Sequence, residues 1–159
     1  MTHPHPTRSP YLSAAVTDGP VALLLVEANG RRNAATVSCY SELAHHPTSL
    51  WVSLAAGSYT HALVDEAGRF TLAVLSDRQG DLAHRCGSVS GRERDKCAAL
   101  DLHASPAGFL YLDGALASSA CRVRGRIPLG DHTVFLADII EGELESRASH
   151  LRHLLLSDL

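Results

Sequence analysis

Short apolar segments of strand length follow one another at hairpin distances along this chain. Residues 21–26 form an unbroken apolar run between turn residues, which predicts a strand buried on both faces. Asn29-Gly30 then predicts a tight hairpin turn into a small and polar partner strand over residues 33–40. Further strands are predicted over residues 50–54, 69–75, 115–124 and 133–141. Because regular βα units are missing, we predict a mainly β fold, an antiparallel barrel of six or seven strands with inserted helices.

The predicted helices are short and lie between these strands. One begins after Thr60 or Ser58, either of which is a good N-cap residue, and ends at Gly68. A turn over residues 128–132 places His132 at the start of the last strand. The other helices are predicted over residues 11–16, 77–85 and 98–100, and residues 143–156 are predicted to form a terminal helix or tail.

The length of 159 residues fits one domain, which we predict over residues 11–159 after a disordered, proline-rich tail over residues 1–10. A net charge of -3 argues against a surface that binds nucleic acid or anionic membranes. The apolar runs are too short to span a bilayer, and the N-terminus has no apolar signal core. We therefore expect no membrane association and a cytoplasmic location.

The cysteine and histidine spacings do not indicate a metal site. The four cysteines include no Cys-x-x-Cys pair, so we expect reduced thiols rather than zinc ligands. His45 and His46 are adjacent, and neighbouring residues of a strand point to opposite faces, so they are poorly placed to share an ion. We predict that the protein holds no metal.

A loop over residues 84–97 is the clearest candidate site. Its glycines and serines favour a turn with free backbone N–H groups, and basic residues follow at once. Among these is Lys96, the only lysine in the chain. Such a loop suits an anion, although the same composition also fits a solvated surface loop. Cys86 in this loop is interpreted either as a small buried hydrophobe or as a thiol activated by nearby arginines.

Four segments together resemble one family, in the same order along the chain. Residues 32–38 read Arg-Asn-Ala-Ala-Thr-Val-Ser, and residues 53–61 read Ser-Leu-Ala-Ala-Gly-Ser-Tyr-Thr-His. Residues 87–96 read Gly-Ser-Val-Ser-Gly-Arg-Glu-Arg-Asp-Lys, and residues 130–132 read Gly-Asp-His. These segments are similar to those of the flavin reductase-like, FMN-binding split-barrel family, which includes the reductase components of two-component flavin monooxygenases.

The resemblance implies a six-stranded antiparallel split barrel, a homodimer, and FMN or possibly FAD as the bound flavin. It implies hydride transfer from NAD(P)H to flavin, and a possible monooxygenase partner that uses the reduced flavin. His132 becomes the candidate catalytic residue, positioned to contact the nicotinamide; a plain turn histidine is the alternative. The implied flavin-contacting residues are Asn33, Ala34, Ala35, Thr36, Val37, Ser38, Ser53, Leu54, Ala55, Ser58, Thr60, His61, Ser88, Ser90, Gly91, Arg92 and Lys96.

The chain also departs from the family pattern. Ala35 stands where the family usually has methionine, and Cys86 and Cys97 stand where phenylalanines are frequent. The tail lacks the expected Pro-Leu-Leu segment and its aromatic end. Two other functions therefore stay open beside the reductase: a flavoprotein that retains FMN and acts on another substrate or electron carrier, and a non-catalytic flavin- or haem-binding module.

Overall fold

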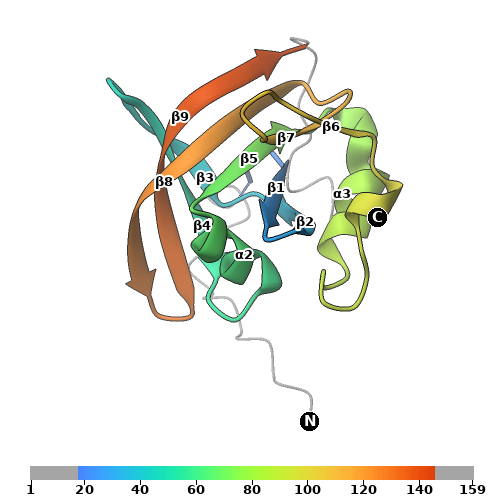
Figure 1. Cartoon of the computed structure of the whole chain (residues 1–159), viewed down its shortest axis with the longest axis horizontal. Helices are drawn as coiled ribbons and strands as arrows, with labels where there is room; N and C mark the ends of the chain where they lie inside the picture. The colour runs from blue at the N-terminus through green and yellow to red at the C-terminus, as the bar shows by residue number, and fades with distance from the viewer. Residues whose placement is uncertain (1–17, 146–159) are drawn as a thin grey trace.

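The computed structural model describes residues 18–145, and its core is one curved antiparallel sheet (Figure 1). The helix predicted over residues 11–16, the tail over 1–10 and the segment 146–159 lie outside the described residues. The strand order is β2-β1-β5-β8-β9-β4-β3. The strands of this sheet are β1 (Ala22–Ala28), β2 (Arg31–Val37), β3 (Tyr40–His45), β4 (Thr48–Ala55), β5 (Arg69–Val74), β8 (Ala117–Leu129) and β9 (His132–Leu144).

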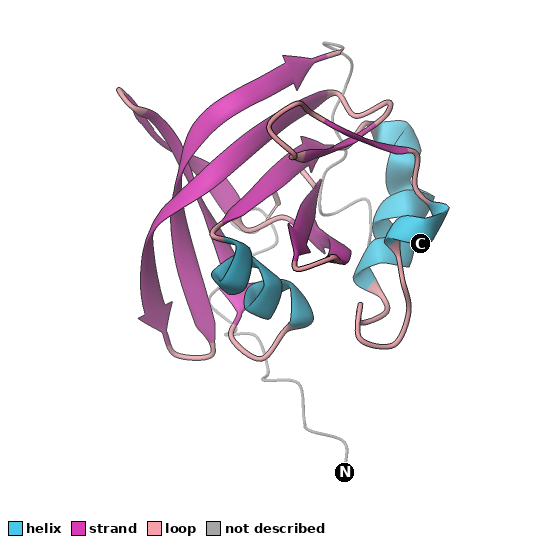
Figure 2. Ribbon diagram, viewed as in Figure 1, coloured by secondary structure: helices cyan, strands magenta, loops and turns pink. Residues whose placement is uncertain are grey.

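The barrel is split because the two end strands of the sheet, β2 and β3, do not pair with each other. A separate two-stranded sheet, β6 (Leu102–Ala104) with β7 (Leu110–Leu112), lies beside the main one. The helical elements are α2 (Tyr59–Ala67), α3 (Gly80–Gly87) and two single turns, η1 (Asp77–Gln79) and η2 (Cys97–Ala99). Figure 2 shows α2 at one end of the curved sheet and α3 on its outer side. The prediction of a mainly β split barrel is confirmed.

The first hairpin forms as predicted, and its first strand, β1, is buried on both faces. Asn29 and Gly30 both have positive φ, at 50° and 74°, which is the backbone that a two-residue hairpin turn requires. Along β1, Leu24 packs into the cluster inside the barrel, whereas Leu23 packs into a second cluster on the outer face. The second cluster is covered by α3, η2 and β7, so β1 is a central strand with no exposed face apart from Glu27.

Three strands were missed by the sequence prediction. The strand predicted over residues 33–40 is two strands, because β2 ends at Val37 and β3 begins at Tyr40. β3 is an exposed edge strand without an alternating apolar pattern, and β6 and β7 have only three residues each. Such strands leave little periodic signal in a sequence. The main sheet therefore has seven strands, and not the six that the family resemblance implied.

The last two strands are longer than predicted. β8 continues through Gly125 and Pro128 to Leu129, with a register shift between Val123 and Gly125. β9 extends to Leu144, so the prediction of a helix or tail from residue 143 is wrong at its first two residues. Both strands gain their extra length by pairing with each other, through 12 of the 13 residues in each strand. Within residues 18–145, no helix combines the length and apolar character needed to cross a bilayer.

Candidate active site

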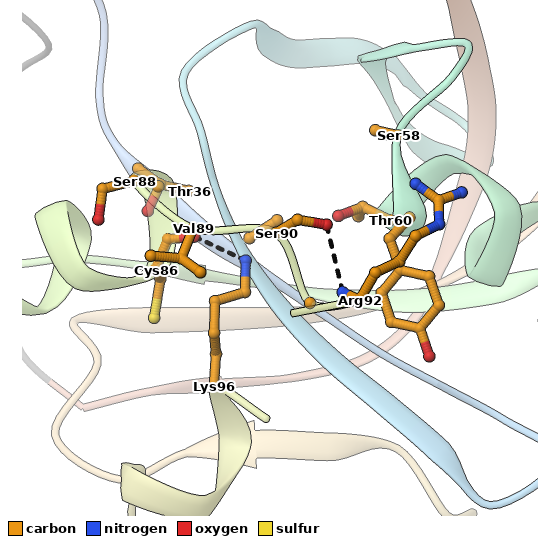
Figure 3. Close-up of a pocket in the computed structure, with 13 residues that line it drawn as sticks. Thr36, Ser58, Thr60, Cys86, Ser88, Val89, Ser90, Arg92 and Lys96 are labelled. Atoms are coloured by element: carbon orange, nitrogen blue, oxygen red, sulfur yellow. Dashed lines mark hydrogen bonds between the residues drawn. The ribbon is translucent and has the colours of Figure 1, made fainter. Parts of the chain in front are cut away.

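A hollow lies between β2, the start of α2 and the loop that follows α3 (Figure 3). Its volume is about 330 Å³, at the small end of the range for ligand pockets. We call it the loop pocket, and the segment over residues 88–96 the basic loop. The lining residues are Ala35, Thr36, Ser58, Tyr59, Thr60, Cys86, Gly87, Ser88, Val89, Ser90, Gly91, Arg92 and Lys96.

One wall of the loop pocket is formed where α3 docks on β2. The Thr36 hydroxyl donates to the Ala83 carbonyl at 2.5 Å, across 47 residues of sequence. Gly87, the last residue of α3, lies against the same side chain, since a Cβ at Gly87 would lie 3.2 Å from Thr36 Cβ. A side chain at Gly87 would press against Thr36. The contacts with Thr36 therefore hold the end of α3, from which the basic loop begins.

The opposite wall is set by the buried side chain of Asn33. Its Nδ2 donates to Thr60 Oγ1 at 2.9 Å, which ties β2 to the first turn of α2. Ser58 is the N-cap of that helix, with its Oγ accepting from the His61 N–H at 3.0 Å, so Ser58 and not Thr60 is the cap. Gly68 ends the helix in the left-handed region, as predicted. Thr60 is buried and serves the Asn33 contact instead.

Two cationic side chains border the loop pocket. Lys96 is only 9% exposed, and its Nζ donates to the Cys86 carbonyl at 2.8 Å. An ammonium group has three N–H donors, so two remain for a ligand. Burial lowers the pKa of Lys96. Figure 3 shows the Lys96 amine pointing to Cys86 and the Arg92 backbone N–H bonded to Ser90.

Arg92 lies at the rim of the pocket. Its Nη1 donates to the Gly57 carbonyl at 3.2 Å, and its guanidinium carbon lies 5.4 Å from the centre of the Tyr59 ring. The side chain is exposed, so it keeps free N–H donors toward solvent or a ligand. Arg92 and Lys96 thus bring two positive charges to a pocket whose lining contains no acidic residue.

Nine of the residues predicted to contact flavin line the loop pocket, and the others do not. Ala34, Val37 and Leu54 are buried in the two hydrophobic clusters, because successive strand side chains point to opposite faces. Asn33 lies behind the wall, while Ser38, Ser53 and Ala55 lie outside the lining. The nine lining residues are Ala35, Thr36, Ser58, Thr60, Ser88, Ser90, Gly91, Arg92 and Lys96.

The two candidate histidines lie outside the lining of the pocket, at the junction of β4, α2 and β9. His132 is the first residue of β9, pairs with Ala55 and is exposed, and its Nδ1 lies 2.9 Å from Asp131 Oδ1. His61 Nε2 lies 3.0 Å from Thr133 Oγ1, and its ring meets Phe135 edge-on. His61 is thereby tied to β9, whereas the His132 side chain is exposed to solvent.

Sequence reasoning did not name Tyr59, Gly87 or Val89 among the flavin-contacting residues, although Gly87 and Val89 lie in the loop predicted over residues 84–97. Tyr59 occupies a variable position of the Ser-x-Thr-His segment, and its contact with Arg92 depends on the loop folding back onto α2. Cys86 lines the pocket, yet burial raises the pKa of its thiol, which favours its interpretation as a small packed side chain.

The loop pocket has the donor set that a flavin phosphate needs. Serine hydroxyls, backbone N–H groups of the basic loop and two cations all lie on one side, and an anion accepts from each of them. On the other side, β2 contributes Ala35 and Thr36, both of which have small side chains. The residues present therefore fit FMN. Fold and site together define a split-barrel protein with a pocket whose cations and hydroxyl groups suit a phosphorylated ligand.

Comparison with known proteins agrees with this description. The family model of the flavin reductase like domain matches residues 15–156, so the chain belongs to this family. It is 30% identical to the actinorhodin polyketide dimerase of Streptomyces coelicolor, covering 86% of this chain and 77% of that protein. It is also 31% identical to an NADH-dependent FMN reductase of Streptomyces nodosus subsp. asukaensis, over 76% of this chain and 66% of that protein.

A third relative is the reductase component of a 4-nitrophenol 4-monooxygenase/4-nitrocatechol 2-monooxygenase from Rhodococcus opacus, 30% identical over 77% of this chain and 64% of that protein. The chain thus spans just under two thirds of the length of two of these relatives. Among solved structures, an FMN-binding protein from Thermus thermophilus with bound 1-cyclohex-2-enone has a TM-score of 0.78 and 27% identity, covering 91% of this chain and 78% of that one.

Proposed function

We propose that this protein is an NAD(P)H-dependent flavin reductase that takes FMN and supplies reduced flavin to a separate monooxygenase. The observation that carries the proposal is the loop pocket, in which two cations and the basic loop face the small side chains of β2. The two relatives named as an FMN reductase and a monooxygenase reductase component support it. When bound, the flavin supplies the ring that accepts hydride.

Each part of the chain has a task in this proposal. Lys96 and Arg92 hold the phosphate, with Ser88 and Ser90 as further donors. The β2 backbone beside Ala35 orients the ring, and the alanine leaves room where the family pattern usually has a methionine. No strong acid or base is needed, because hydride transfer depends on stacking and distance rather than on proton transfer.

His132 is the proposed contact for the nicotinamide. Its exposed ring lies at the start of β9, next to the segment that leads into the α2 wall of the loop pocket. The neighbouring Asp131 carboxylate accepts from Nδ1 and holds the ring orientation. The Asp131 carbonyl in turn accepts from the Ala56 N–H at 2.9 Å, which fixes the turn against the 55–58 segment.

The assembly that we propose is a homodimer in the cytoplasm. Large apolar side chains are exposed on the paired strands β8 and β9 and on the edge strand β3, which β4 separates from β9, and a second copy would cover them. These side chains are Leu43 on β3, Ile127 and Leu129 on β8, and Ile140 and Leu144 on β9. The four cysteines are free, which is typical of a reducing compartment. Sedimentation equilibrium tests the dimer, and a monomer at micromolar concentration would contradict it.

An anaerobic spectrum tests the enzyme activity directly. Purified protein is mixed with excess FMN, and then NADH or NADPH is added while flavin absorbance is followed. Bleaching over many turnovers confirms a reductase. If FMN binds but neither nucleotide bleaches it, the reductase proposal is wrong, and a non-catalytic binding module explains the pocket instead.

One observation favours a second candidate, a flavoprotein that retains its FMN and acts on another substrate. The Thermus thermophilus protein, which is 27% identical, is described as FMN-binding with a cyclic enone bound. Gel filtration after FMN loading separates the two candidates. A reductase that uses flavin as a co-substrate loses FMN on the column, whereas the second candidate retains it.

A further inference from the structure

Two buried cysteines lie at the two ends of the basic loop. Cys86 is in the last turn of α3, and Cys97 is the first residue of η2. Only 3% of Cys86 and 1% of Cys97 is exposed, and both belong to the hydrophobic cluster on the outer face of β1. The residues between them include the serines and cations that border the loop pocket. A bond between these two thiols would therefore close the loop that is proposed to hold the FMN phosphate.

The side chain of Lys96 joins the two cysteine positions. Its Nζ donates to the Cys86 carbonyl at 2.8 Å (Figure 3), and Lys96 immediately precedes Cys97 in the chain. This hydrogen bond holds the end of α3 against the start of η2. Burial raises the pKa of Cys97 to about 11, and a charge on Cys86 adds to this rise. The two thiols thus lie near enough for a charge on one to act on the other.

The other two cysteines are not placed to form such a pair. Cys39 is exposed and lies between β2 and β3. Cys121 belongs to the separate cluster inside the barrel, and its Sγ donates to the Ser119 carbonyl at 3.3 Å. Cys86 and Cys97 also stand where the family pattern frequently has phenylalanine. Two phenylalanine rings would only fill the cluster, whereas two thiols can also be oxidised.

We propose that Cys86 and Cys97 form a reversible disulfide that weakens FMN binding when hydrogen peroxide accumulates. The inference rests on the proposed function, because reduced flavin that no monooxygenase takes up reacts with O2 to give oxidised flavin and hydrogen peroxide. The reductase thereby supplies the oxidant for its own thiols. Cys86 lines the loop pocket, so it is the thiol of the pair that a small oxidant entering the pocket meets first.

The oxidation balances in two steps. The Cys86 thiol loses its proton and its sulfur attacks one oxygen of the peroxide, so the O–O bond breaks, a sulfenic acid forms, and hydroxide leaves and takes up the proton as water. The Cys97 sulfur then displaces the sulfenic hydroxyl group, which leaves with the Cys97 proton as a second water. The two sulfurs lose two electrons and the peroxide gains them. Burial raises the pKa of both thiols, so the first step is slow and the disulfide accumulates over many turnovers.

The disulfide acts on FMN through Lys96. A disulfide restricts the separation and orientation of its two Cβ atoms more narrowly than packed thiols do, so the start of η2 adjusts relative to α3. Lys96 is adjacent to Cys97, and its ammonium group therefore moves relative to the Cys86 carbonyl and the loop pocket. Loss of one charge-assisted hydrogen bond to the phosphate corresponds to a rise of about tenfold or more in the Kd for FMN.

The direct test treats the purified protein with hydrogen peroxide in the absence of nicotinamide nucleotide. Free thiols are then alkylated and the protein is digested with trypsin. Cleavage after Arg92, Arg94 and Lys96 separates the two cysteines, so the peptides over residues 86–92 and 97–122 stay together only if a disulfide joins them. Cys121 lies in the second peptide, and fragment masses distinguish it from Cys97. We expect a bond between Cys86 and Cys97 that dithiothreitol removes.

FMN binding provides the functional readout. The Kd for FMN is measured before and after peroxide treatment, and each variant is compared only with its own reduced form. We expect the Kd of the wild type to rise about tenfold, as for the loss of one charge-assisted hydrogen bond, and to return after dithiothreitol. Cys97→Ala should show no rise. The matched control is Cys39→Ser, which should respond as the wild type does because Cys39 is exposed and outside the cluster.

Several outcomes would overturn the proposal. They are free thiols at Cys86 and Cys97 after peroxide, oxidation of Cys86 that stops at a sulfenic or sulfinic acid, a disulfide that leaves the Kd unchanged, and an equal rise in Cys97→Ala. If Cys97→Ala does not fold, the wild-type peptide map and the reversal by dithiothreitol decide the question. A wild type that forms the disulfide and loses FMN affinity but reduces no flavin would contradict the proposed function and confirm the redox site.

Discussion

Gly91 packs so closely on Asn33 that a Cβ at Gly91 would lie 2.2 Å from the Asn33 Oδ1 atom. The same Cβ would lie 2.7 Å from Tyr59 Cδ1, so it would meet both β2 and α2. Asn33 is buried and its Nδ2 is bonded to Thr60, so it has no free space in which to move. The glycine therefore determines how closely the basic loop approaches the barrel.

Gly91→Ala is expected to open the loop pocket and to weaken FMN binding. The added methyl group overpacks a rigid site, which typically costs about 1–3 kcal/mol of stability. Differential scanning calorimetry and FMN titration check the two effects. The matched control is Gly57→Ala, because a Cβ at Gly57 meets no atom within 4 Å. Equal FMN affinity in Gly91→Ala and wild type would contradict this view of the loop.

Lys96→Met is expected to weaken FMN binding about tenfold or more, since hydrogen bonds to charged groups are worth about 1.5–3 kcal/mol. Methionine keeps most of the buried stem but leaves the Cys86 carbonyl without its donor. FMN affinity is measured by fluorescence quenching, with riboflavin as the comparison ligand. Riboflavin lacks the phosphate, so its affinity changes far less if Lys96 acts on that group.

The pH dependence of FMN binding provides a second readout of Lys96. Burial lowers its pKa, so the folded protein loses this charge at a lower pH than the unfolded chain does. FMN affinity should fall as pH rises through that lowered pKa. The contribution of Lys96 to folding has the opposite sign, because the unfolded state binds more protons in the same window and stability rises with pH. In Lys96→Met both effects should disappear.

Thr36→Val is expected to loosen α3 from β2. The substitution removes the hydrogen bond that the Thr36 hydroxyl donates to the Ala83 carbonyl, at a cost of about 0.5–1.5 kcal/mol. Hydrogen exchange of the α3 amides should quicken more than that of β1. Thr48→Val is the control, since its hydroxyl donates to the His45 carbonyl at an exposed turn, where water replaces the bond. An equal increase in the exchange rates of the α3 and β1 amides would contradict a local role of Thr36 in holding α3.

His132→Ala is expected to lower the kcat/KM for NADH while leaving FMN affinity unchanged. The ring is exposed and its hydrogen bond is to the neighbouring Asp131, so the melting temperature should hardly change. His45→Ala provides an exposed histidine control in the β3–β4 hairpin. A full rate in His132→Ala would remove this residue from the proposed mechanism.

Thiol titration should find one fast cysteine in the folded protein and four after denaturation. Cys39 is exposed, whereas the other three cysteines are buried. Burial raises the pKa of Cys97 to about 11 and that of Cys121 to about 12, and it also raises the pKa of Cys86. These thiols are therefore protonated and slow at neutral pH. Rapid modification of Cys86, prevented by FMN, would instead show a reactive thiol in the pocket.

Several parts of the fold were predictable because their signals are local. Asn29 and Gly30 both adopt the positive φ angles that these two residue types tolerate, and these angles form the turn. The helix over Tyr59–Ala67 begins and ends at its own cap residues, Ser58 and Gly68. The edge strand Tyr40–His45 was not predictable in this way. Its pairing comes from the neighbouring strand β4, and its exposed side chains follow no periodic pattern.

The sequence alone determined the antiparallel β character of the protein, the position of the basic loop and the family, because turn chemistry and short motifs depend on residues close together in the chain. Only the tertiary structure decided which predicted residues share one pocket. Strand alternation sends Ala34 and Val37 into opposite hydrophobic clusters, whereas Thr36 meets Ala83 across 47 residues. The same packing places Lys96 in the wall of the loop pocket, since the loop that carries it is held by contacts with β2 and α2.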